Sequence, residues 1–341
     1  MDFLTAASIT HPNGETTHYY EGGSKDGTPL IFIHGWPDIA QSWHHQLKHF
    51  SSSKYRVLAP DMRGYGGSSA PKDKRAYSLE VLTNELVDFA HQLGIQKAIW
   101  VGHDWGCGVV NALAAHHPEL FLGLAVLAVP YRSLELGLDF MVAHVNRDIY
   151  PKEEYPYGQF EYQVKYERDP EDSIRGLSDA DQSKLVKLLH TPHNPAHYGK
   201  PAFTSRSLRD GSMGAQLASA PDIPLEYTFL DESLYKALLE SHKKHGWFPP
   251  TAYYLNHDVN AEFAKSEVNG GVLEFPVLYI DAKHDAICST TTLPLAAETQ
   301  KRAAKLLSYE LIESGHWVHL EKPKETNEAL EKWLGAIQIQ K

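Results

Sequence analysis

The sequence predicts an α/β fold in which a mostly parallel central sheet carries helices on both faces and a helical cap is inserted into the core. Three observations predict it. Short apolar runs alternate with helix-like patterns over residues 1–132 and again over 263–341. Several of these runs end in turns that contain glycine or aspartate. Residues 133–262 lose the alternation and are rich in tyrosine, histidine and proline, so this stretch is expected to be the cap.

The first part of the core opens with a buried strand over residues 30–33, which breaks into a loop at His34-Gly35. Residues 56–60 predict a second strand. Between 79 and 93, leucine and phenylalanine recur at helical spacing until Gly94 stops the pattern, so a helix with one buried face is expected there.

The apolar residues Ala98-Ile99-Trp100-Val101 predict a strand that runs into Gly102-His103-Asp104-Trp105-Gly106 and then a helix. Gly-x-X-x-Gly between a strand and a helix is a tight turn that exposes the side chain of X above the carboxyl edge of the sheet. Here X is Asp104, a carboxylate that is ionised at neutral pH and can attack carbon without a base. Such an attack suits a saturated carbon with a leaving group, as in epoxides and alkyl halides. The alternative is that Asp104 only caps the following helix.

Later strands are expected at 121–127, 275–280 and 306–312, followed by a last amphipathic helix around 327–334. The polar turn after the second of these strands contains Asp281 and Asp285. We predict Asp285 as the acid of a catalytic triad, with Asp281 as the alternative.

The loop after the last strand presents His316, which we predict as the base, with His319 as the alternative imidazole. A carboxylate bonded to one imidazole nitrogen leaves the other nitrogen free to take a proton. Because Asp104 needs no base, that proton would come from water. The loop His34-Gly35-Trp36-Pro37 is expected to supply a backbone N–H, so that Trp36 and Trp105 form an oxyanion hole.

Together these segments resemble the epoxide hydrolases of the α/β-hydrolase superfamily, over nearly the whole chain. The resemblance implies an α/β-hydrolase fold, a covalent ester on Asp104, a vicinal diol as product and no cofactor. It also suggests a cis peptide bond between Trp36 and Pro37. The matching segments are His34-Gly35-Trp36-Pro37, Asp61-Met62-Arg63-Gly64-Tyr65-Gly66-Gly67-Ser68, Gly102-His103-Asp104-Trp105-Gly106, Asp285, and Gly315-His316-Trp317 before Glu321-Lys322-Pro323.

The resemblance further implies two cap tyrosines whose hydroxyls bind the epoxide oxygen and assist its departure. Phe160-Glu161-Tyr162-Gln163 resembles the first site and Ala252-Tyr253-Tyr254-Leu255-Asn256 the second, so we expect Tyr162 and Tyr254 to bind substrate together with Trp36 and Trp105. Tyr253 is the alternative to Tyr254 for this role. Successive residues of a helix point about 100° apart, so only one of the two can face the pocket.

Two other functions remain open. A haloalkane or haloacid dehalogenase also uses an aspartate nucleophile, and its halide needs N–H donors, which the indoles of Trp36 and Trp105 could supply. A small-molecule receptor or pseudoenzyme on the same fold is the second, because fold alone does not define function.

Metal sites are not expected. The chain has 20 histidines, and the spacing of the pairs His242/His245 and His193/His197 could suit a metal ion. Neither pair belongs to a His-Glu-x-x-His or Cys/His pattern, which zinc sites usually show. Cys107 and Cys288 are expected to be buried thiols rather than a disulfide.

Composition excludes several partners. The net charge is −11 and no basic stripe is present, so neither nucleic acid nor a membrane surface is expected. The most apolar run, residues 120–129, is about half of what a bilayer span requires. Residues 1–5 lack a secretory signal pattern, so a cytoplasmic location is expected. The expected partners are an epoxide and water, in a monomer or homodimer.

Overall fold

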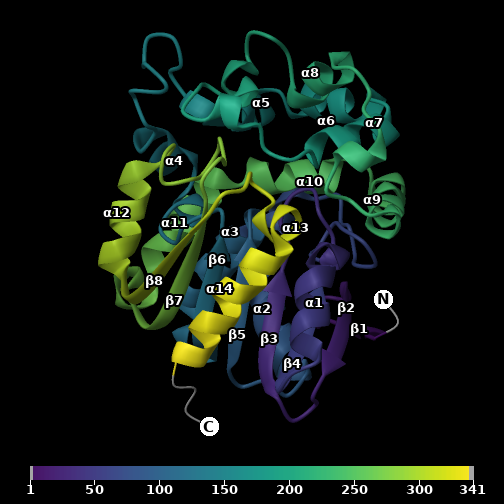
Figure 1. Cartoon of the computed structure of the whole chain (residues 1–341), viewed down its shortest axis with the longest axis vertical. Coiled ribbons are helices and arrows are strands. Elements are labelled where there is room, and N and C mark those ends of the chain that lie inside the picture. The colour runs from purple at the N-terminus through teal and green to yellow at the C-terminus, as the bar shows by residue number, and fades with distance from the viewer. Residues whose placement is uncertain (1–2, 338–341) are drawn as a thin grey trace.

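The structure is a computed structural model that describes residues 3–337. Met1 and Asp2, on which the expectation of a missing signal peptide partly rests, lie outside the described residues. One sheet forms the centre of the molecule (Figure 1). Its strands are β1 (Thr5–Thr10), β2 (Thr16–Gly23), β3 (Thr28–Ile33), β4 (Tyr55–Pro60), β5 (Ala98–His103), β6 (Phe121–Leu127), β7 (Leu273–Ala282) and β8 (Ala304–Ile312).

The strand order is β1-β2-β4-β3-β5-β6-β7-β8, and every pair from β4 to β8 is parallel. The predicted α/β fold with a mostly parallel sheet is therefore confirmed. The antiparallel strands β1 and β2 were not predicted. They lie at one edge of the sheet, where half-exposed strands lack the continuous apolar runs that mark β3 to β7.

Helices cover both faces of the sheet. Figure 1 shows α1 and α14 in front of it, and they pack there with α13. Helices α2 and α3 pack against each other on the opposite face, where α12 covers β8. The bounds are α1 (His44–Ser51), α2 (Leu79–Gln92), α3 (Trp105–His116), α12 (Pro294–Ala303), α13 (Val318–Glu321) and α14 (Pro323–Ala336).

Each face has its own apolar core. Trp43, Leu47 and Trp333 pack with strand side chains on the face of α1 and α14. On the other face, the predicted helical pattern is confirmed, because Leu82 and Leu86 of α2 are buried against α3. Helix α3 is buried along almost its whole length, so its backbone is held rigidly behind the turn that precedes it.

A long helical insertion joins β6 to β7, and Figure 1 shows α5 to α9 lying across the top of the sheet. Its helices are α4 (Leu138–Ala143), α5 (Glu161–Arg168), α6 (Pro170–Asp179), α7 (Gln182–Leu189), α8 (Met213–Ser219), α9 (Glu232–His245), α10 (Phe248–Ala252) and α11 (His257–Phe263). We call this insertion the cap; its division from the core at residues 133 and 262 stays a prediction. Within residues 3–337, no helix combines the length and the apolar character needed to cross a membrane.

Candidate active site

Asp104 occupies the sharp turn between β5 and α3, with φ 53° and ψ −124°. The two flanking positions must be glycine, because other backbone atoms lie too close for a Cβ. A Cβ at Gly106 would lie 2.1 Å from the carbonyl oxygen of Ile33, and one at Gly102 would lie 2.8 Å from that of Gly106. The Asp104 side chain makes no capping hydrogen bond to α3, so the helix-cap alternative has no support here.

Both carboxylate oxygens of Asp104 face predicted site residues. The backbone N–H of Trp36 donates to Oδ1 at 2.7 Å, and Nε2 of His316 lies 3.3 Å from Oδ2. The side chains of Asp104 and His316 are 14% and 13% exposed, so water can reach both. The peptide bond between Trp36 and Pro37 is cis, as the resemblance suggested.

His316 is held on its other side by Asp285. Its Nδ1 lies 2.8 Å from Oδ2 of Asp285, which is fully buried. The second oxygen of Asp285 accepts the backbone N–H of Ile287 at 2.8 Å. The structure therefore brings Asp104, His316 and Asp285 into one chain of contacts, although the three residues are far apart in the sequence.

The two alternative residues have other surroundings. Asp281 accepts hydrogen bonds from the hydroxyls of Tyr279 at 3.1 Å and Tyr309 at 2.8 Å. His319 packs its ring against Trp43, with ring centroids 4.3 Å apart. Neither contact joins the Asp104–His316 pair.

The proton affinity of His316 reflects its two carboxylate neighbours. Burial lowers its pKa, but Asp285 and then Asp104 outweigh burial and raise the pKa to about 10. At neutral pH the ring is therefore an imidazolium that can donate to both carboxylates.

Tyr162 of α5 and Tyr254 of the single turn Tyr253–Leu255 pack edge-on against each other, with ring centroids 5.6 Å apart. The ring of Tyr254 also packs edge-on against Trp105 at 5.2 Å and near Trp36 at 6.3 Å. Burial, with the charge of Asp104 adding to it, raises the pKa of both phenols well above the usual 10. Both tyrosines are therefore protonated at neutral pH.

Tyr253 points elsewhere. Its hydroxyl donates to the carbonyl oxygen of Arg63 at 2.9 Å, and its ring packs against Tyr65 and Tyr77. Adjacent helical residues thus face different surroundings, and of the two Tyr254 lies beside Tyr162.

Two groups that lie near the site were assigned no role in the sequence analysis. Gln163 donates from Nε2 to the hydroxyl oxygen of Tyr162 at 2.9 Å, which leaves the Tyr162 proton free to be donated. Asp38 accepts from Nε2 of His190 at 3.1 Å and from Nε1 of Trp317 at 3.1 Å, and so links α7 of the cap to both loops beside the triad. No local pattern indicates either group, because the partners of Asp38 are distant in the chain and neighbours such as Gln163 are common.

The histidine pairs singled out in the sequence are engaged separately. His242 stacks on Trp247 with ring centroids 4.3 Å apart, whereas Nε2 of His245 lies 2.8 Å from the carbonyl oxygen of Gly66. His193 pairs with Glu321, whose other oxygen accepts the N–H of Gly315. Cys107 and Cys288 are both buried and free.

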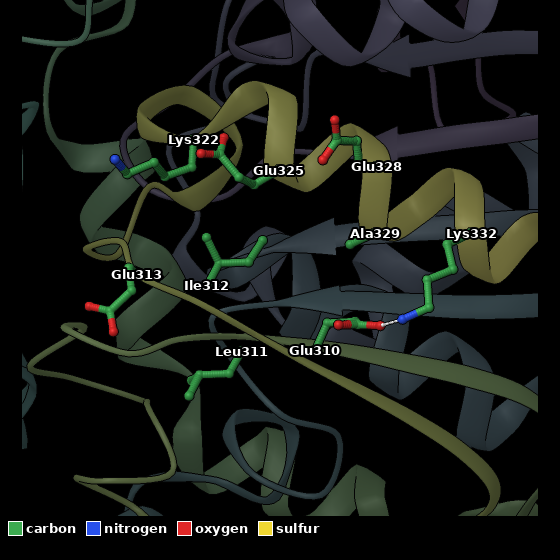
Figure 2. A pocket seen from close by; sticks show the side chains of 9 residues that line it. All are labelled: Glu310, Leu311, Ile312, Glu313, Lys322, Glu325, Glu328, Ala329 and Lys332. Carbon is green, nitrogen blue, oxygen red and sulfur yellow. Dashed lines mark hydrogen bonds and ion pairs between the residues drawn. The ribbon is translucent and has the colours of Figure 1, made fainter.

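A hollow on the surface, shown in Figure 2, lies between β8 and α14 and contains no triad residue. Its walls are mostly charged, and Lys332 forms an ion pair with Glu310 across it. We assign it no part in catalysis. Its lining is Glu310, Leu311, Ile312, Glu313, Lys322, Glu325, Glu328, Ala329 and Lys332.

Comparisons with known proteins bear out the resemblance to epoxide hydrolases. The chain is 28% identical over 322 residues to the bifunctional epoxide hydrolase 2 of Sus scrofa, covering 94% of this chain and 53% of that protein. It is 27% identical over 340 residues to epoxide hydrolase A of Mycobacterium tuberculosis, covering 97% and 98%. The chain thus spans about half the length of the mammalian relatives and nearly all of the mycobacterial one.

Among solved structures, epoxide hydrolase A from Mycobacterium thermoresistibile superposes with a TM-score of 0.79 at 25% identity, covering 99% of this chain and 100% of that one. An epoxide hydrolase from Vigna radiata, at 23% identity and a TM-score of 0.77, shares the fold. The family profile described as alpha/beta hydrolase fold matches residues 28–323. The chain therefore belongs to the alpha/beta hydrolase fold family.

Proposed function

We propose that this protein is an epoxide hydrolase, which opens an epoxide through a covalent ester on Asp104 and hydrolyses that ester to a vicinal diol. One observation carries the proposal. An aspartate at the turn after β5 contacts a histidine and a backbone amide, and its charge acts on two protonated tyrosines that pack against each other in the cap. The printed names of the relatives support the same substrate class.

In the first step, Oδ2 of Asp104 attacks one epoxide carbon. Oδ1 is held by the Trp36 amide and becomes the ester carbonyl oxygen, whereas Oδ2 keeps a lone pair for attack beside its longer contact with His316. The carbon–oxygen bond of the ring breaks, and its electron pair goes to the epoxide oxygen. Tyr162 and Tyr254 hold that oxygen and supply a proton, because an alkoxide is far more basic than a phenol.

In the second step, His316 takes a proton from water, and the resulting hydroxide attacks the ester carbonyl carbon. The backbone amides of Trp36 and Trp105 stabilise the oxyanion of the tetrahedral intermediate. Removing one such donor typically costs about 10²–10³ in rate. In the collapse of the intermediate the bond between Cγ and Oδ2 breaks and the hydroxyl proton of the intermediate passes to the departing alkoxide oxygen. The diol is released, and Asp104 is regenerated as a carboxylate with one oxygen from water.

Ester formation itself prepares His316 for this role. While Asp104 is ionised, His316 binds its proton too tightly to act as a base at neutral pH. Alkylation converts Asp104 to a neutral ester, removes one of the two charges that hold the proton, and so lowers the pKa of His316. The proton that His316 then releases restores the tyrosine that protonated the epoxide oxygen, and the neutral ring can take a proton from water. The Asp285 carboxylate remains and keeps the ring oriented.

The experiment is a single turnover in ¹⁸O-labelled water, with excess enzyme over a panel of aryl and alkyl epoxides. The label should enter Asp104 and be absent from the first diol, because the diol oxygen comes from Asp104. The Asp104→Ala variant should form no diol. Label in the first diol would refute the ester mechanism, since water would then have attacked the epoxide directly.

A dehalogenase remains the second candidate, because one observation favours it. The indole nitrogens of Trp36 and Trp105 are buried and have no hydrogen-bond partner among residues 3–337, so both are available as donors. The two tyrosines favour the epoxide, since a halide leaves without a proton. Halide release without diol formation from the same panel, extended to haloalkanes, would reverse this preference. If neither diol nor halide were formed from any substrate, a small-molecule-binding role would be favoured. The cytoplasmic location and the oligomeric state stay predictions.

A further inference from the structure

Three buried side chains beside the triad have no part in the proposed reaction. Asp38, His103 and His319 are fully buried, and each offers one oxygen or nitrogen such that these atoms all lie within 4.8 Å of one another. They come from three different segments: the loop after β3, the last residue of β5 and helix α13. Asp38 lies two residues after Trp36, His103 directly precedes Asp104, and His319 lies three residues after His316.

The ring of His103 is held by a hydrogen bond at one nitrogen, and its other nitrogen has no partner. Its Nε2 lies 2.9 Å from the backbone carbonyl oxygen of His316. A carbonyl only accepts hydrogen bonds, so Nε2 carries the hydrogen and Nδ1 carries the lone pair. Within residues 3–337, this Nδ1 is buried and has no hydrogen-bond partner. An imidazole that donates one N–H to a carbonyl and presents its other nitrogen is the usual arrangement of a metal-binding histidine.

His319 is buried with neither nitrogen satisfied by any residue that the structure describes. Its ring lies between Trp43 and His103, with ring centroids 4.3 and 4.4 Å away. Buried polar groups are nearly always hydrogen-bonded, so a ring with two unpartnered nitrogens calls for a missing partner.

Asp38 supplies the charge that such a partner would need. Its two oxygens each accept one hydrogen bond, from His190 and from Trp317. Each oxygen still has a further lone pair, and a metal-binding carboxylate is commonly held by hydrogen bonds of this kind.

We propose that Asp38, His103 and His319 bind one divalent transition-metal ion, and that Zn²⁺ is the ion this donor set fits. Two imidazoles and one carboxylate are a recurring zinc ligand set, in which a water molecule supplies the fourth ligand. Tetrahedral zinc–ligand bonds of about 2.0–2.2 Å place the ligand atoms roughly 3.3–3.6 Å apart, so binding would draw the three side chains inward. The ion would join the loops that carry Trp36, Asp104 and His316, and so act as a brace rather than as a catalyst.

This site differs from the expectation that no metal is bound. That expectation rested on the absence of closely spaced ligand motifs, and residues 38, 103 and 319 are too far apart in the chain to form one. The site is independent of the proposed reaction, so its test does not require activity.

The test measures retained zinc. The full chain is produced in zinc-supplemented medium, treated briefly with a small excess of EDTA to strip surface ions, desalted and analysed by mass spectrometry for metal content. The native protein should retain about one zinc per chain, because its ligands are fully buried. His319→Gln and Asp38→Asn should each lower the retained zinc at least tenfold. His197→Gln, at an exposed histidine of a rejected pair, is the matched control and should retain the native amount.

Thermal unfolding supplies the second measurement. Zinc-loaded native protein should melt at a higher temperature than protein produced without added metal, and His319→Gln should lose this difference. Equal zinc in the native protein and His319→Gln would overturn the proposal, because binding would then occur at surface histidines. Absence of zinc from the native protein would also overturn it, and would indicate that water satisfies these nitrogens.

Discussion

Replacing Asp104 by asparagine removes one negative charge next to His316 while keeping the size of the side chain. The variant imitates the neutral ester of the proposed mechanism. If ester formation is what turns His316 into a base, the same loss of charge in the variant should lower the pKa of His316.

The expected size follows from one distance. Nε2 of His316 lies 3.3 Å from Oδ2 of Asp104. At an effective dielectric constant of about 20, two unit charges at this separation interact by roughly 5 kcal/mol. Since one pH unit corresponds to about 1.4 kcal/mol, this loss would bring the pKa of His316 from about 10 into the neutral range. The Asp285 contact is retained and keeps the pKa from falling further.

The assay is an NMR titration of the histidine imidazoles in isotope-labelled protein, with His316 assigned by its disappearance in His316→Gln. The matched control is Glu313→Gln, a nearby exposed carboxylate whose partners are Lys283 and His284. The control should leave the His316 titration unchanged. A His316 pKa that stays near 10 in Asp104→Asn would refute the reasoning, because Asp104 would then not be the charge that holds the proton.

Three further predictions follow from the same contacts. Tyr162→Phe combined with Tyr254→Phe should slow single-turnover ring opening by about 10²–10⁴-fold, whereas Tyr253→Phe should change it little, because Tyr253 is bonded to Arg63. Gly106→Ala should lower the melting temperature strongly, since its Cβ would lie 2.1 Å from a carbonyl oxygen, whereas Gly335→Ala in α14 meets nothing within 4 Å and should be neutral or stabilising. The pKa of His316 in the folded protein lies above its ordinary value of 6.5, so its ion pairs contribute their full stabilisation of the folded state below about pH 6.5. That contribution is lost as the pH rises through about 10. The urea midpoints of the native protein and His316→Gln should therefore converge over that range.

Much of the core could be predicted from the sequence, because the patterns that define its strands and helices extend over only a few residues. The apolar runs that predicted β3 to β7 lie in the interior of the sheet, whereas the predicted β8 forms its largely exposed edge. The leucine spacing of α2 marks its buried face. The glycines around Asp104 were equally informative. Each stands where a Cβ would collide with backbone, so the turn can hardly form with other residues.

Other features depended on the packing of distant segments. The strands β1 and β2 have one half-exposed face and gave no continuous apolar signal. The difference between Tyr253 and Tyr254 lies in which surroundings each meets. The contacts of Asp38 with His190 and Trp317 cross 152 and 279 residues of chain, and no spacing rule connects them.

The sequence by itself determined the α/β fold, the aspartate at the turn, and the order of Asp104, Asp285 and His316 along the chain. Those features follow from hydrophobic periodicity and from turn geometry, which act over a few residues. Only the tertiary structure decided that His316 contacts Asp285 rather than Asp281, that Tyr254 faces Tyr162, and that Asp38, His103 and His319 share one buried space. Such contacts depend on how separate loops meet at the edge of a sheet, and their distances are set by packing of the whole chain.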